Sequence, residues 1–282
     1  MKNLFSPILI IISQFAAAQS IPTSCFKIGG WGAEYMVASV PTYDGNYVMA
    51  GQTHTWNDGG YDGNLYVVKC DLSGNIIWTH AEGTNDEDYT ASIIETSDHS
   101  LVLAGEGNSD IILIKYAANG TQLWSKAIDV IDFDGSLDII ETSDGDYLIS
   151  GQSEISLGPK YSTLIKVDAD GNLIWNKNYT SGFDTWAFAV TETADHHYIV
   201  AGQIADFQVS LFVFCVDADG NLVWEKYSPH GWAWYDAITT SDSDVVLVGF
   251  NYISDYDVSV MKLTTSGDTI WSRSFGDSLL DI

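Results

Sequence analysis

Acidic residues recur along this sequence just before runs of β-forming residues, and carboxylates in such a place could bind a cation. Hard cations such as Ca²⁺ prefer oxygen ligands, and several carboxylates that converge on one point form the usual site. Aspartate is also common in turns, where its side chain hydrogen-bonds the local backbone, so a purely structural role explains the same residues. Four residues form this candidate calcium set: Glu34, Asp88, Asp134 and Asp184.

Paired carboxylates could instead hydrolyse a glycoside, with one group as the acid and the other as the base or nucleophile. The candidates near the starts of predicted strands are Asp88, Asp138, Asp184 and Asp236. Such an enzyme concentrates its chemistry in one asymmetric site, whereas the repeat units of this chain remain alike. We therefore expect a protein without catalytic residues and without a required cofactor, and glycoside hydrolysis stays an alternative.

Aromatic residues that break the repeat are the third set of candidates. Exposed aromatic rings beside acidic groups suit stacking on sugar rings or the anchoring of a hydrophobic peptide. Packing between repeat units explains the same residues without a ligand. We favour a binding face, and the expected partner is a glycan or an extracellular protein. The candidate ligand-binding residues are Trp186, Trp232, Trp234, Tyr235, Trp56 and Tyr61.

Five tryptophans, each four residues after a glycine, are spaced 46 to 51 residues apart along the chain. They are Trp78, Trp124, Trp175, Trp224 and Trp271. A tandem repeat of this length indicates a repeat architecture. In the second unit, four β-rich runs cover residues 91–96, 101–105, 111–115 and 121–124, and turn residues separate them. This pattern predicts strands joined by hairpins.

The third run of several units is continuously apolar, as in Leu65–Val68 and Leu211–Phe214. A strand exposed on one face would alternate, so both faces of these strands are expected to be covered. Four-stranded sheets that stack face to face around an axis form a β-propeller. We predict an all-β propeller of four-stranded antiparallel blades, with five complete repeats of about 48 residues. The predicted blades span approximately residues 31–80, 86–126, 134–177, 184–226 and 232–273, and residues 274–282 begin a further unit.

Two motifs of the repeat carry a resemblance to a known family. Residues 141–147 read Glu-Thr-Ser-Asp-Gly-Asp-Tyr, and residues 168–175 read Asp-Ala-Asp-Gly-Asn-Leu-Ile-Trp. The turn and the tryptophan-anchored hairpin resemble the repeats of secreted bacterial β-propeller proteins of the Bacteroidetes type. The resemblance covers roughly residues 25–282. It implies the propeller and export from the cell, and it implies little about function because those proteins are mostly uncharacterised.

The number of blades in the intact ring is open. Residues 23–28 look like a fourth strand without a blade before it, and residues 276–282 look like the start of a sixth unit. Either five blades close on themselves, or the chain is part of a ring of about six to eight blades. We favour the incomplete ring. It would expose strand edges and apolar blade surfaces, so self-association is expected in that case.

Charge and the N-terminal residues restrict the class of protein further. The formal net charge of −27 argues against binding to nucleic acid, because phosphate recognition needs clustered Lys and Arg. Residues 1–18 have the features of a secretory signal peptide with cleavage near Ala18, so residues 19–282 are expected to be a secreted, periplasmic or cell-surface domain. No later stretch is long and apolar enough to predict a transmembrane segment.

The cysteines and the basic residues have structural explanations. Three cysteines, Cys25, Cys70 and Cys215, leave at least one thiol unpaired, and their spacing does not specify a disulfide. Nine of the eleven basic residues fall at two positions of the repeat, so we expect hairpin contacts within each blade rather than a binding patch. The first set is Lys69, Lys115, Lys166 and Lys262, and the second is Lys27, Lys126, Lys177, Lys226 and Arg273.

Overall fold

The computed structural model describes residues 34–54, 63–83, 87–129, 133–154, 158–180, 182–205, 209–228, 233–252 and 256–276. The predicted signal peptide lies outside these residues, as do Cys25, Trp56, Tyr61 and Trp232. Within the described ranges we find no helix that is long and apolar enough to cross a membrane.

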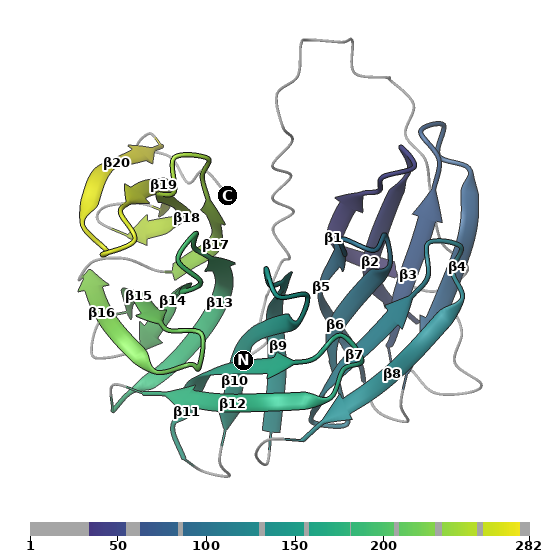
Figure 1. Cartoon of the computed structure of the whole chain (residues 1–282), viewed down its shortest axis with the longest axis horizontal. Coiled ribbons are helices and arrows are strands. Elements are labelled where there is room, and N and C mark those ends of the chain that lie inside the picture. The colour runs from purple at the N-terminus through teal and green to yellow at the C-terminus, as the bar shows by residue number, and fades with distance from the viewer. Residues whose placement is uncertain are drawn as a thin grey trace.

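Twenty strands form five antiparallel four-stranded sheets, which we call blades 1 to 5 (Figure 1). In every blade the four strands pair in sequence order. This confirms the predicted all-β chain of five four-stranded units.

Blade 1 contains β1 (Glu34–Pro41), β2 (Tyr47–Thr53), β3 (Asn64–Cys70) and β4 (Ile76–Glu82). Blade 2 contains β5 (Tyr89–Glu95), β6 (Leu101–Gly107), β7 (Asp110–Tyr116) and β8 (Gln122–Ile128). Blade 3 contains β9 (Phe133–Glu141), β10 (Tyr147–Glu154), β11 (Lys160–Val167) and β12 (Leu173–Tyr179). Blade 4 contains β13 (Asp184–Glu192), β14 (Tyr198–Ala205), β15 (Val209–Val216) and β16 (Leu222–Ser228). Blade 5 contains β17 (Ala233–Thr239), β18 (Val245–Tyr252), β19 (Tyr256–Leu263) and β20 (Thr269–Phe275).

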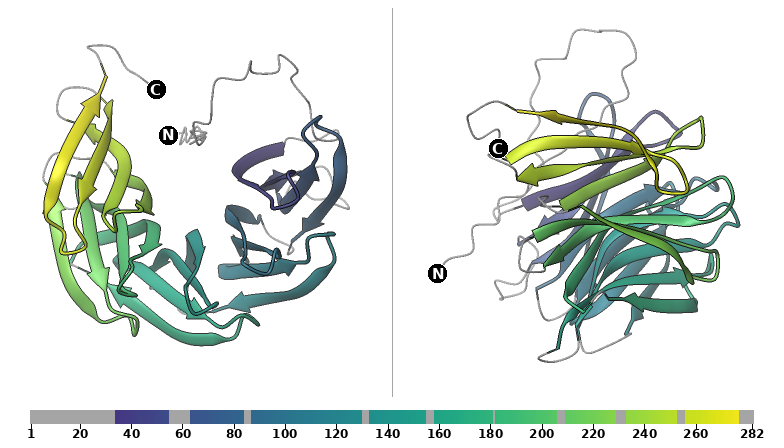
Figure 2. Two further views of the ribbon diagram at one scale, coloured as in Figure 1. Left: turned by 45° about the horizontal axis from the view of Figure 1, so that its top comes forward. Right: turned by 90° about the vertical axis from the view of Figure 1, so that its left-hand side faces the viewer.

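The blades follow one another along an arc. The first strand of each blade packs against the first strand of the next, which places β1, β5, β9, β13 and β17 on the inner side. Figure 2 shows the last strand of each blade on the outer side, and it shows blades 1 and 5 at opposite ends of an open arc. The described residues therefore have the blade order of a propeller without closing the ring.

Apolar residues fill the space between each pair of neighbouring blades. The strand β15 shows the principle, because Phe212 and Phe214 pack toward blade 3 while Leu211 and Val213 pack toward blade 5. Successive side chains of a strand point to opposite faces. A strand in the middle of the stack therefore needs apolar residues at every position, as the continuous runs in the sequence predict.

The inner strand of every blade contains a one-residue β-bulge. The bulge brings a carbonyl group of the inner strand against the second strand. A Cβ atom at Gly51 would overlap with the carbonyl oxygen of Tyr35, and one at Gly202 would overlap with that of Trp186. The repeated glycine at the end of the second strand is therefore required by this close approach.

The lysines at the end of the third strands pair with the aspartate of the first hairpin of their own blade. The Nζ–Oδ2 distances are 2.7 Å for Lys69 and Asp44 and 2.6 Å for Lys166 and Asp144. Three members of the second basic set, Lys126, Lys177 and Lys226, lie against the hairpin turn of the following blade. Lys226, for example, donates to the carbonyl oxygen of Gly267. The first set reaches the next blade as well, since Lys69 also donates to the carbonyl oxygen of Ala118. The prediction of contacts within single blades therefore holds only for the ion pairs of the first set.

Candidate functional site

The four residues of the predicted calcium set lie at or just before the starts of inner strands. Asp88 is fully buried, and Glu34 and Asp184 are half-buried. The Asp184 carboxylate accepts a hydrogen bond of 2.9 Å from the Lys160 amide, which is a local backbone contact. Asp134 belongs to β9, but its side chain is not among those described. Among the described residues, no three His, Cys, Asp or Glu side chains are grouped so that they could hold a metal ion.

Two of the carboxylates considered for hydrolysis occupy equivalent places on the inner side of the arc. Asp138 and Asp236 each follow the bulge of their inner strand directly. Each accepts a hydrogen bond of 2.8 Å from the next amide of its own strand, Ile139 or Ala237. The residue at the same position of blade 2 is Ser92, and its hydroxyl donates to Asp138 at 3.3 Å.

Asp138 links three blades. Its second carboxylate oxygen accepts a hydrogen bond of 3.1 Å from the Val190 amide of blade 4. The side chain keeps partial contact with solvent on the inner face and yet lies deep among protein atoms. Burial raises the pKa of Asp138 to about 7, against the lowering effect of the two amides, and the charge of Asp236 adds to the rise. Burial also raises the pKa of Asp236.

Aromatic residues gather on the inner strands of blades 4 and 5. Phe188 and Tyr235 are the bulge residues of β13 and β17, and their ring centroids are 5.0 Å apart at an interplanar angle of 33°. Phe250 on β18 contacts Tyr235 edge-on at 5.8 Å. Trp186 lies two residues before Phe188 on β13, with the Lys160 ammonium of blade 3 at 5.8 Å from its ring. All four rings are half-buried, and we call them the inner aromatic cluster.

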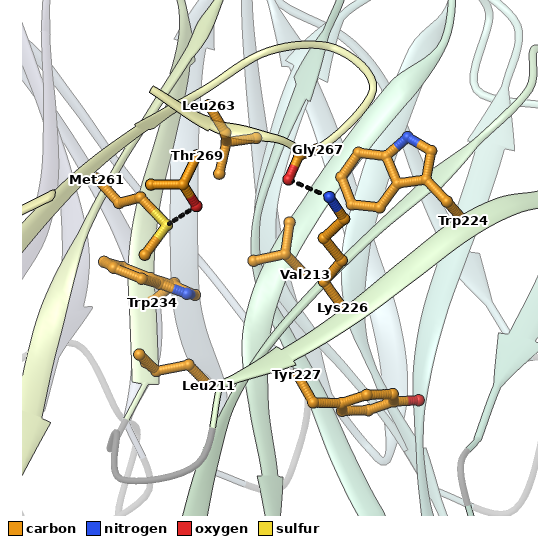
Figure 3. A pocket seen from close by; sticks show the side chains of 10 residues that line it. All are labelled: Leu211, Val213, Trp224, Lys226, Tyr227, Trp234, Met261, Leu263, Gly267 and Thr269. Carbon is orange, nitrogen blue, oxygen red and sulfur yellow. Dashed lines mark hydrogen bonds between the residues drawn. The ribbon is translucent and has the colours of Figure 1, made fainter. Parts of the chain in front are cut away.

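Trp234 has a different environment from the other predicted contact residues. Its side chain is 2% exposed and lines a cavity of about 220 Å³ between blades 4 and 5 (Figure 3). Met261 lines this cavity at the position that Phe214 occupies between blades 3 and 4. Trp234 therefore belongs to the packing between blades, the structural alternative considered from the sequence.

Sequence patterns pointed to Trp186 and Tyr235 but not to Phe250, and they named Asp138 as one of four candidate carboxylates without separating it from the other three. The position of the bulge decides which side chains turn to the inner face, and the bulge appears only when the strands are paired. Cys70 and Cys215 are buried free thiols, and burial raises the pKa of both.

No protein-family model matches the chain, and no curated protein matches it by sequence. Among solved structures, the chain is similar to a protein of unknown function from Bacteroides caccae, with 9% identity over 87% of this chain and 84% of that one and a TM-score of 0.59. It is also similar to the periplasmic gluconolactonase of Pseudomonas aeruginosa, with 18% identity over 86% and 71% and a TM-score of 0.61. The Dos1 propeller shares 10% identity over 86% of this chain and 59% of that one, with a TM-score of 0.58. These similarities show the fold alone, which is of the β-propeller type.

Proposed function

We propose that this chain is a non-catalytic, extracellular binding protein, and that it binds a carbohydrate on the inner aromatic cluster. The observation that carries the proposal is the contact of Phe188 with Tyr235 at the bulge positions of consecutive blades. The same position is held by Val37, Ala91 and Leu137 in the other three blades. At the bulge position itself, aromatic rings therefore occur only in blades 4 and 5. The position of Trp186, two residues before the bulge, is also aromatic in blades 1 and 2, where Tyr35 and Tyr89 stand.

The chemistry of the cluster suits a sugar ring. Half-buried rings offer an apolar face for stacking, and their geometry is fixed because each ring is packed on a neighbour. Polar groups next to the rings can accept hydrogen bonds from hydroxyls, and Asp236 follows Tyr235 directly in the chain. Binding sites commonly combine an apolar lining with a few convergent polar groups on a concave surface.

The hydrogen bonds of Asp138 support a structural role over a catalytic one. Two backbone amides and one hydroxyl donate to its carboxylate, so its lone pairs are used in holding blades 2, 3 and 4 together. A nucleophile or general base needs a lone pair that is directed at a substrate. This arrangement is the reason that we favour binding over hydrolysis.

The test is a titration of the purified full chain with a panel of neutral oligosaccharides, monitored by calorimetry and by tryptophan fluorescence. Phe188→Ala and Tyr235→Ala should each weaken binding about tenfold or more, which is about 1.4 kcal/mol. Val37→Ala changes the same bulge position in blade 1 and is the matched control. Equal affinity of the control and the two cluster variants would refute the proposal, and so would a protein or peptide ligand that the cluster variants bind unchanged.

Glycoside or lactone hydrolysis is the second candidate, because Asp138 has a pKa raised to about 7 and lies within electrostatic reach of Asp236. A carboxyl group that titrates near neutral pH can serve as a general acid. One protein of similar fold is named a periplasmic gluconolactonase, so a lactone is the first substrate to test. Turnover by the full chain that Asp138→Asn and Asp236→Asn both abolish would favour this candidate over binding.

A further inference from the structure

Neighbouring blades are connected by a joint that occurs four times in the chain. The repeat tryptophan of one blade lies against the glycine turn of the next, so closely that a Cβ on the glycine would touch the indole. The pairs are Trp78 with Gly120, Trp124 with Gly171, Trp175 with Gly220, and Trp224 with Gly267. In two joints the indole nitrogen also donates to a carbonyl oxygen of that turn, as Trp224 does to Thr265 at 3.0 Å.

Polar contacts on the strands further in accompany the joint between blades 2 and 3 and the joint between blades 3 and 4. Lys115 of blade 2 donates to the Tyr147 hydroxyl of blade 3 at 3.0 Å, and Lys166 donates to Tyr198 of blade 4 at 3.3 Å. Each of these tyrosines is only 1% exposed. These two joints therefore have a donor half, with the tryptophan and the lysine, and an acceptor half, with the glycine turn and the tyrosine. The other two joints keep the tryptophan and the glycine turn, with Leu101 and Val245 at the position of the tyrosine.

The two ends of the arc carry one unmatched half each. Blade 5 ends the described arc with the donor half, and Trp271 is 39% exposed, while Lys262 stands at the position of Lys115. Blade 1 begins the arc with the acceptor half. Its turn glycine, Gly74, is half-buried where the equivalent glycines of the other blades are buried, and Tyr47, at the position of Tyr147, is 44% exposed.

We propose that two copies of this chain associate head to tail, with the donor half of blade 5 on one copy docked onto the acceptor half of blade 1 on the other. The surfaces are complementary because they are the two sides of a joint whose tryptophan–glycine contact the chain forms four times within itself and whose lysine–tyrosine contact it forms twice. Trp271 would lie against Gly74, and Lys262 would reach Tyr47. Such an interface is heterologous, so one copy can bind a second at either end.

The net negative charge of the chain predicts how the association depends on salt. Two copies with a net charge of −27 each repel one another at low ionic strength, and salt screens this repulsion. The joint itself is mainly apolar and uses hydrogen bonds to carbonyl groups. Added salt should therefore strengthen the association, whereas an interface held by ion pairs would weaken.

The experiment is size-exclusion chromatography with light scattering on the full chain, over a range of protein and salt concentrations. The expected wild-type result is a mass that rises from one copy toward two or more with concentration. Trp271→Ala and Tyr47→Ala should each remove the association without unfolding, because both side chains are exposed. Ile270→Ala is the matched control, since Ile270 is 47% exposed and points to the other face of β20.

A mixture of the Trp271→Ala and Tyr47→Ala variants provides the decisive arm. Each variant keeps the half that the other lacks, so the mixture should form a dimer although neither variant does so alone. Failure of the mixture to associate would refute a head-to-tail interface. A wild-type chain that stays monomeric at all concentrations would also overturn the proposal, whether small-angle scattering then shows an open arc or a closed ring.

Discussion

Replacing Asp138 by asparagine should remove a specific dependence of stability on pH. The wild-type carboxyl group has a pKa raised to about 7 by burial, against an ordinary value of 3.8. Between these two values the folded chain holds a proton on Asp138 and the unfolded chain does not. The contribution to stability is therefore fully present below the unfolded pKa and is lost as the pH rises through about 7.

The magnitude follows from the same two values. A difference of about three pH units corresponds to about 4 kcal/mol in total, at 1.36 kcal/mol for each unit. Between about pH 5 and pH 8, the folded group loses its proton while the unfolded group is ionised throughout. The wild-type chain should therefore lose about 3 kcal/mol of unfolding free energy over this interval because of Asp138 alone.

The assay is urea denaturation of the wild type and of Asp138→Asn at several pH values in this interval. Carboxylates such as Asp44 and Asp242 have a lowered pKa, chiefly through hydrogen bonds from Lys69 and Lys262, and they titrate below the interval. The six histidines are common to both chains, so any contribution from them cancels in the difference. An exposed turn carboxylate, changed in Asp170→Asn, is the control for the loss of one charge.

Parallel pH profiles of the wild type and Asp138→Asn would refute the reasoning. They would mean that the hydrogen bonds donated by Val190, Ile139 and Ser92 outweigh burial and keep the carboxylate ionised. The absolute stability of Asp138→Asn does not decide the question, because the amide nitrogen cannot accept the bond from Val190.

Two further substitutions test the packing of the blades. Lys166→Met should lower the unfolding free energy by about 1–2 kcal/mol in urea denaturation, because it removes charge-assisted hydrogen bonds to Asp144 and Tyr198, while Asp144 is exposed enough to be solvated. An unchanged midpoint would show that the buried ammonium costs as much as its bonds provide. Met261→Phe should fill the cavity of about 220 Å³ and raise the unfolding free energy by about 1 kcal/mol. The reverse change, Phe214→Met, should lower it at the equivalent place, and a loss of stability in both variants would mean that the cavity cannot accept a ring.

The fold was largely predictable from the sequence because the repeat sets its own register. Gly120 and Gly171 turn the hairpins with positive φ angles of 89° and 76°, and the tryptophan four residues later lies against the glycine turn of the next blade. Continuous apolar runs such as Leu211–Phe214 correctly indicated strands covered on both faces. It was not predictable that lysines of the second basic set contact the next blade, because such a contact gives the same spacing in the sequence as a contact within the blade.

The candidate site was less predictable, because the orientation of its side chains depends on a β-bulge, and no particular residue type marks the position of that bulge in the sequence. Phe188 and Tyr235 turn to the inner face as bulge residues, whereas Trp234, one residue earlier, turns into the core. A shift of one position in a strand exchanges the two faces. The adjacent residues Trp234 and Tyr235 therefore lie on opposite faces of their strand. The presence of aromatic residues in the sequence could not show which of them is on the surface and which is part of the packing.

The residues that differ from the repeat are the most informative about a specific function of this chain. A residue that recurs in the blades is explained by the contacts between neighbouring blades. Cys215 replaces the lysine that the other blades have at this position. The equivalent aspartate, Asp195, instead has the Nδ1 atom of His197 at 3.3 Å from its Oδ2 atom. The aromatic pair of Phe188 and Tyr235 departs from the smaller residues of blades 1 to 3 in the adjoining part of the arc. The departures thus concentrate in blades 4 and 5, and a ligand that needs an asymmetric surface would find it there and not in the uniform joints.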